Sequence, residues 1–185
     1  MTPHTVECED EMSTMSNIEN IPAVPLSPIE GSAPPPSTGR QRPTWNEYLL
    51  ILAAAASQRS QDPWVQVGAI VARSDYSIVG SGYNGPPGGC EIDWSDRDAR
   101  RQFVIHAEVN ALAHAKPGEA KIIASTLLPC PACLTMIASY GVKEVVYRDV
   151  YLRTVSESEA IAKAFGLTMT RIPQPRIFPT KLVHL

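Results

Sequence analysis

The residues with the clearest capacity for chemistry are Cys130 and Cys133, three apart, and His106, which lies 24 positions before the first of them. At the start of a helix, a Cys-x-x-Cys pair places both sulfur atoms on one face, which suits a tetrahedral zinc ion. Alone, such a pair is equally typical of a redox dithiol or of two buried small residues. An imidazole and two thiolates leave one zinc position open to water. We therefore predict that these three residues bind Zn2+.

Glu108 follows His106 by two positions, in the order His-Ala-Glu. Either residue alone is more typical of a structural role, as a buried histidine or a solvated carboxylate. Their combination with Pro129-Cys130-Pro131-Ala132-Cys133 is typical of zinc-dependent nucleobase deaminases, in which the glutamate moves protons. A spacing of two lets both side chains face one site only at the first turn of a helix or at its entry. We expect that placement, with Glu108 catalytic.

A structural zinc site is the alternative from a different functional class. It would require a fourth protein ligand, for which Cys90 and His114 are available in the sequence. In that case the chain would be a regulatory or interaction protein, and Glu108 would have no chemical role.

The periodicity of apolar residues predicts the elements that position these side chains. Thr44 and Glu47 form a capping box before a helix over 45–59. Two strands, 65–71 and 77–83, form a hairpin that ends in the glycine- and proline-rich loop 84–89. The remaining predicted elements are helix 102–115, strand 122–128, helix 131–139, strand 143–147, helix 157–165 and strand 167–172. This order predicts an α/β fold with a mixed five-stranded sheet, parallel in its later half, between helices on both faces.

Composition limits the other possibilities. The 185 residues include 44% hydrophobic and 19% charged residues, with a formal net charge of −3. Residues 1–43 contain eight of the seventeen prolines and six acidic but only two basic residues, so we expect a disordered tail before a catalytic domain over 44–185. No apolar run is long enough to cross a membrane and no secretory signal is present, which predicts a cytoplasmic protein. The near-neutral charge argues against a stable nucleic-acid partner.

The chain resembles the deoxycytidylate (dCMP) deaminases of the cytidine deaminase-like superfamily. The likeness extends from about Trp45 to Arg171 and is carried by residues 59–63 (RSQDP), 66–69 (QVGA), 82–88 (GYNGPPG), 106–111 (HAEVNA) and 129–133 (PCPAC). It implies a three-layer α/β/α sandwich and hydrolysis of dCMP to dUMP and ammonia, which supplies dUMP for thymidylate synthesis. It also implies that Asn84 contacts the deoxyribose, and it suggests a homo-oligomer, commonly a hexamer, with dCTP and dTTP as possible regulators.

Recognition of the substrate phosphate requires hydrogen-bond donors. The candidates are Arg59 and Ser60 at the end of the first helix, and Tyr147, Arg148 and Tyr151 after the fourth strand. The charged interval between Cys90 and Arg101 gives no basis for predicting regulation. Deamination of dCTP, or of a free base, a nucleoside or tRNA at the same site, remains the alternative activity, although the balanced charge disfavours tRNA.

Overall fold

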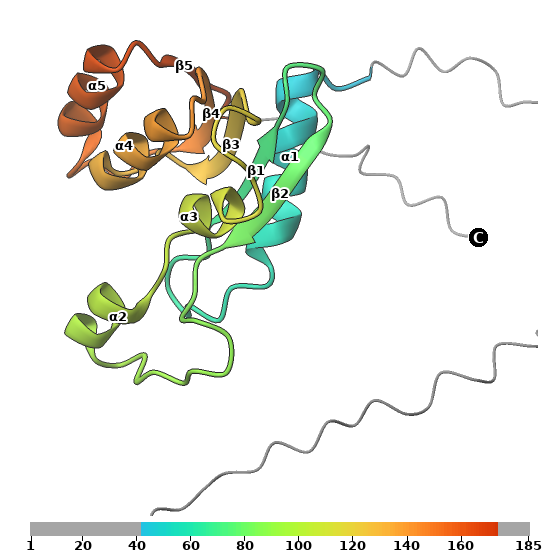
Figure 1. Cartoon of the computed structure of the whole chain (residues 1–185). Helices are drawn as coiled ribbons and strands as arrows, with labels where there is room; N and C mark the ends of the chain where they lie inside the picture. The colour runs from blue at the N-terminus through green and yellow to red at the C-terminus, as the bar shows by residue number, and fades with distance from the viewer. Residues whose placement is uncertain (1–41, 174–185) are drawn as a thin grey trace, which may run out of the picture. The chain divides into compact units, whose positions relative to one another are not determined.

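The computed structural model describes residues 42–173, which form a single five-stranded sheet with helices on both faces (Figure 1). The strand order is β2-β1-β3-β4-β5. The strands are β1 (Gly68–Ala72), β2 (Ile78–Tyr83), β3 (Ile122–Leu127), β4 (Glu144–Asp149) and β5 (Thr168–Arg171). β1 runs antiparallel to both β2 and β3, whereas β3, β4 and β5 are parallel. The predicted mixed sheet with a parallel later half is confirmed.

One face of the sheet is covered by α1 (Trp45–Ser57). The helix begins with the predicted capping box, in which Glu47 N donates to Thr44 Oγ1 and the Thr44 backbone N donates to the Glu47 carboxylate. Its apolar side meets alternate residues of the strands, since successive strand residues point to opposite faces. This core contains Leu49, Leu50, Ala53, Ile70, Ala72, Ile122, Ala124 and Val146.

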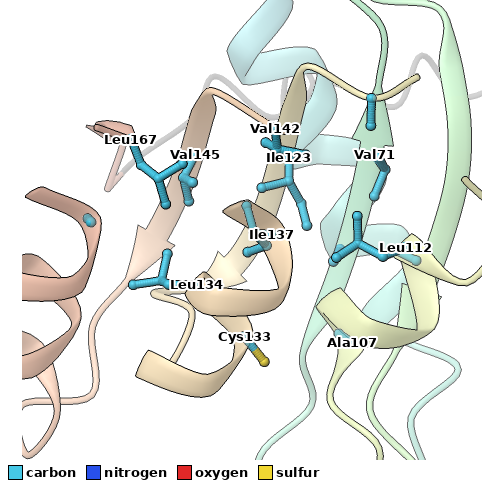
Figure 2. Close-up of a cluster of buried hydrophobic side chains, with 14 of the residues drawn as sticks. Val71, Ala107, Leu112, Ile123, Cys133, Leu134, Ile137, Val142, Val145 and Leu167 are labelled. Carbon is cyan, nitrogen blue, oxygen red and sulfur yellow. The ribbon is translucent and has the colours of Figure 1, made fainter. Parts of the chain in front are cut away.

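The opposite face is covered by α3 (Ala107–Leu112), α4 (Pro131–Ser139) and α5 (Val155–Ala164). Figure 2 shows side chains of these helices against the sheet: Leu112 and Ile137 lie toward Val71 and Ile123. Cys133 belongs to this core, yet its sulfur atom lies at the first turn of α4, at one end of the cluster. The fold is therefore the expected α/β/α sandwich, and one of the candidate ligands is anchored in its core.

The predicted helix over 102–115 is wrong in its first part. The structure has a separate α2 (Arg97–Phe103), then an extended stretch, and only then α3. Two backbone hydrogen bonds between Gly85 and Ile105, of 3.1 and 2.9 Å, hold this stretch in a β-bridge. β-Branched residues favour such extended backbone, and the tertiary bridge overrides the local helical pattern. The break places His106 as the N-cap residue of α3.

The other boundaries differ from the predictions by a few residues at most, as is usual at frayed ends. Within residues 42–173, each helix is too short or too polar to cross a lipid bilayer. The prediction of a disordered tail over 1–43 lies almost entirely outside the described residues.

Candidate active site

The three predicted ligands lie together at the start of two neighbouring helices. His106 is the N-cap of α3, Cys130 is the N-cap of α4, and Cys133 lies in the first turn of α4. His106 Nδ1 is 3.5 Å from Cys130 Sγ and 3.3 Å from Cys133 Sγ. The ligand atoms of all three lie within 4.8 Å of one another, the one such metal-binding group among residues 42–173.

These distances fit zinc. A tetrahedral zinc ion with bonds of about 2.3 Å to sulfur and 2.0–2.1 Å to nitrogen would hold its ligand atoms about 3.5 Å apart. Neither Cys90 nor His114 belongs to the group. A closed site of four protein ligands, as the structural-zinc alternative requires, is therefore not formed by the described residues.

Without a bound metal, the pKa values of the two cysteines are shifted in opposite directions. The hydrogen bond from Cys133 lowers the pKa of Cys130 to about 4, and His106 assists. The same hydrogen bond, together with burial, raises the pKa of Cys133. The interaction with Cys130 also raises the pKa of His106. A preformed thiolate beside an imidazole is a strong metal ligand, and a divalent cation would displace the remaining proton.

Glu108 lies in the first turn of α3 and is 4% exposed. One of its carboxylate oxygens accepts a 3.0 Å hydrogen bond from Ser125 Oγ on β3. Burial raises the pKa of Glu108 above its ordinary value, because desolvation disfavours the charged form. His106 is the N-cap residue of α3, and Glu108 is the second residue of this helix. Both side chains therefore lie at the first turn, where a spacing of two positions allows them to face one site. A carboxylate with a raised pKa beside a metal-binding group can both accept and donate a proton.

α3 approaches β2 closely because Gly82 has no side chain. A Cβ atom at this position would collide with the backbone of α3 at Ala107 O and Ala111 N. Glycine is therefore required for this packing distance. Since Glu108 follows Ala107 directly, the same contact sets the depth of the carboxylate.

The metal-binding group of His106, Cys130 and Cys133 lies at a cavity of about 420 Å³. Its lining residues include His106, Glu108 and Cys130, together with polar groups from four other segments. The remaining lining residues are Asp62, Val65, Val67, Asn84, Arg100, Arg101, Val104, Ala107, Leu127, Leu128, Tyr151 and Thr154. A volume of this size and mixed polarity suits a small polar ligand.

Asn84 is buried at the edge of this cavity, and its amide is held in one orientation. Its Oδ1 accepts from Val67 N at 2.7 Å, and its Nδ2 donates to Val65 O at 2.9 Å. The second Nδ2 contact, to Asp62 Oδ2, is long at 3.5 Å. One amide hydrogen is thus weakly engaged and available to an acceptor in the cavity.

The other three predicted substrate contacts, Tyr151, Ser60 and Arg59, lie in three different places. Tyr151 lines the cavity. Ser60 does not line the cavity. Its side chain is buried and donates to the backbone carbonyl oxygen of Asn84 at 2.8 Å. Arg59 lines a separate pocket of about 300 Å³ formed by the glycine-rich loop, and so is not brought to the metal-binding group.

The two remaining phosphate candidates lie away from the metal-binding group. Tyr147 and Arg148 are on β4 and do not line the cavity. The Arg148 guanidinium pairs with Asp149 at 2.8 Å.

Sequence reasoning missed several polar residues of the cavity wall. Arg100 and Arg101 belong to α2, which was not predicted, and Asp62 and Thr154 lie in loops. Asp62 is buried and accepts from the backbone N–H groups of Trp64 and Val65, which fixes the loop after α1. The sequence signal for the two arginines was the charged interval before His106.

The comparisons with known proteins agree with this geometry. The family model for the cytidine and deoxycytidylate deaminase zinc-binding region matches residues 43–149. The human deoxycytidylate deaminase is 35% identical over 133 residues, which cover 66% of this chain and 75% of the relative. The deoxycytidylate deaminase of Mycobacterium phage D29 is 38% identical over 126 residues, which cover 57% of this chain and 95% of the phage protein.

A solved structure also matches. The dCMP deaminase of cyanophage S-TIM5, crystallised with dCMP and dUMP, superimposes with a TM-score of 0.61 at 31% identity. The match covers 72% of this chain and all of the phage chain. The family model includes all the residues that form the metal-binding group and Glu108. The chain therefore belongs to the cytidine and deoxycytidylate deaminase family.

Proposed function

We propose that this protein hydrolyses dCMP to dUMP and ammonia, and so supplies dUMP for thymidylate synthesis. The observation that carries the proposal is the buried Glu108 carboxylate beside the His106, Cys130 and Cys133 group at the floor of a cavity. The similarity to named deoxycytidylate deaminases supports dCMP as the substrate.

In this proposal His106, Cys130 and Cys133 are the zinc ligands. Zinc in such an open site supplies a hydroxide nucleophile near neutral pH. The protein fixes the position of this group through the N-cap placement of His106 and Cys130. It adds rigidity through Ser158 of α5, whose hydroxyl donates to Pro129 O at 3.0 Å, directly before Cys130.

Glu108 is the proton-transfer group. Hydrolysis forms a C–O bond at C4 of the pyrimidine and breaks the bond from C4 to the amino nitrogen. In between, a proton from water must reach ring nitrogen N3, and another must reach the departing amine so that it leaves as ammonia. A buried carboxylate with a raised pKa can accept each proton and release it in turn, and Ser125 keeps it in place between transfers.

The substrate-binding residues are proposed from the cavity lining and from the hydrogen bonds of Asn84. Asn84 would contact the sugar hydroxyl with the amide hydrogen that now lies 3.5 Å from Asp62. Tyr151 would contact the substrate from the cavity wall, and Ser60 would act by supporting Asn84. Arg59 could reach the substrate only by leaving the pocket at the glycine-rich loop.

The wider setting is also proposed from the family resemblance. It comprises a catalytic domain over 44–185, a cytoplasmic location, assembly into a homo-oligomer and regulation by dCTP and dTTP. The cavity at the glycine-rich loop, whose lining includes Arg59, Tyr83, Cys90 and residues 85–89, is the place in this chain where a regulator would be sought.

The deciding experiment measures ammonia release by the zinc-loaded protein from dCMP, dCTP, deoxycytidine and CMP in parallel assays. We expect preference for dCMP, with Glu108→Gln retaining zinc and folded structure but losing turnover. Preferential turnover of dCTP would assign a triphosphate substrate to the same chemistry. Near-normal activity in Glu108→Gln would refute the role of this carboxylate. If the wild-type protein releases no ammonia from any of the four compounds, the proposed activity is refuted.

A further inference from the structure

Arg100 is a cation that lines the cavity and has no ion-pair partner among residues 42–173. It belongs to α2, which stands away from the sheet in Figure 1, and it lines the same cavity as His106 and Glu108. The ion pairs found among residues 42–173 are Arg73–Glu119 and Arg148–Asp149, and neither involves Arg100. Its Nε is buried and has no hydrogen-bond partner in the described part of the chain. A buried polar atom of this kind normally requires a partner.

The two acidic residues that line the same cavity, Asp62 and Glu108, form no ion pair with this arginine. Asp62 lines the same cavity, but its Oδ1 accepts from two backbone N–H groups, at 2.9 and 3.0 Å, and its Oδ2 faces the Asn84 amide. Asp62 is therefore committed to the loop that it organises. The guanidinium of Arg100 can therefore pair with an anionic ligand that enters the cavity. A partly buried guanidinium is stabilised strongly by a hydrogen-bonded anion.

Trp64 determines how the arginine is presented. The Arg100 guanidinium carbon lies 4.0 Å from the centre of the Trp64 ring, a distance at which cation–π attraction is substantial. The loop that carries Trp64 is fixed by Asp62, which accepts from Trp64 N. Stacking restrains the guanidinium before a ligand arrives, so less conformational entropy is lost on binding.

We infer that Arg100, held against Trp64, is the residue that binds the 5′-phosphate of the nucleotide substrate. The inference rests on the proposed function and names a specificity-determining residue for it. A guanidinium offers several donors in a fixed fork that matches phosphate oxygens. A nucleoside lacks the 5′-phosphate, so Arg100 distinguishes a nucleotide from a nucleoside. The base is recognised by other residues, near the metal-binding group.

The test compares binding of dUMP and deoxyuridine by calorimetry, which does not depend on turnover, in the wild-type protein and in Arg100→Gln. The wild type should bind dUMP more tightly than deoxyuridine. In Arg100→Gln this preference should fall about 10- to 100-fold, as expected for loss of a charge-assisted contact, while deoxyuridine affinity changes less than about threefold. Arg100→Lys keeps the charge without the fork and should retain part of the preference. It also serves as the second variant if the glutamine variant does not fold.

Arg153→Ala is the matched control. Arg153 is exposed, lies two residues from Tyr151, and does not line the cavity, so its removal tests whether any nearby positive charge matters. It should leave the preference for dUMP within about twofold. A preference retained in Arg100→Gln, or an equal loss of both ligands, would overturn the inference. Ammonia release from dCMP by the wild type is scored separately: its absence alongside an Arg100-dependent preference for dUMP would refute the proposed activity and leave the phosphate assignment standing.

Discussion

Ser125 Oγ donates a 3.0 Å hydrogen bond to Glu108 Oε1, and both residues are buried, at 0% and 4% exposure. The donor lies on β3 and the acceptor on α3, so the bond joins the central sheet to the group proposed to move protons. A hydrogen bond to a buried carboxylate is stronger than one at the surface and fixes its rotamer. Ser125 is in this sense a positioning residue.

Ser125→Ala should lower turnover of dCMP about tenfold, the scale of one hydrogen bond to a charged group. Zinc content measured by elemental analysis should be unchanged, since Ser125 is not a metal ligand. Ser139→Ala is the control, because the hydrogen bonds of this exposed serine within residues 42–173 stay inside α4. Activity that matches the control would show that Glu108 is positioned without this bond.

Glu108→Gln should raise the thermal stability of the metal-free protein at pH 7. Burial raises the pKa of Glu108 above its ordinary value of 4.5, so the folded state binds this proton more tightly than the unfolded state does. Wild-type stability is therefore lost as the pH rises from about 4.5 through the folded-state pKa. The neutral glutamine lacks this dependence. We expect a midpoint at least about 2 °C higher than that of the wild type, measured by circular dichroism.

The control for this prediction is the same comparison of thermal stability at low pH. The difference between Glu108→Gln and the wild type should vanish below pH 4.5, where the carboxyl is protonated in both states. A difference of constant size from pH 4 to pH 7 would assign the effect to packing and not to the buried charge.

In acid, Cys130 of the metal-free protein should be alkylated more readily than Cys90. The hydrogen bond from Cys133 lowers its pKa to about 4, so it is a thiolate at pH 5, where an ordinary thiol is almost fully protonated. The lower intrinsic nucleophilicity of such a thiolate offsets part of this advantage. We expect iodoacetamide to modify Cys130 about ten times faster than the exposed Cys90, as quantified by peptide mass spectrometry.

Added zinc should protect Cys130 and leave the rate at Cys90 unchanged. Equal rates at the two cysteines without metal would contradict the preformed thiolate. A lack of protection by zinc would remove Cys130 from the proposed ligand set.

Gly82→Ala should destabilise the protein by about 1–3 kcal/mol and reduce zinc content, because the added Cβ collides with the backbone of α3. Displacement of α3 would move His106 and Glu108 together. Gly88→Ala is the matched control: a Cβ there meets no atom within 4 Å, so stability should change by less than about 0.5 kcal/mol. Chemical denaturation measures both variants. If the two variants are equally stable, the close approach of α3 and β2 does not need glycine.

The candidate site residues and most of the helices and strands can be predicted from the order of residues alone. Residue type and spacing predict His106, Glu108, Cys130 and Cys133 as the site residues, and apolar periodicity predicts the sheet and four of the five helices found in residues 42–173. These features are local: a cap, a helical face or a strand is specified within a few neighbouring residues.

Contacts between residues far apart in the sequence follow from the three-dimensional packing of the elements. The pairing of Gly85 with Ile105 breaks the predicted helix and makes His106 an N-cap residue. The contact of Ser125 with Glu108 spans 17 positions, and the stacking of Arg100 on Trp64 joins a short helix to a loop. Such contacts depend on how the elements are stacked, which no local periodicity encodes. For the same reason Arg59, which belongs to one of the family motifs, lies in a different pocket, whereas Arg100, outside those motifs, lines the cavity.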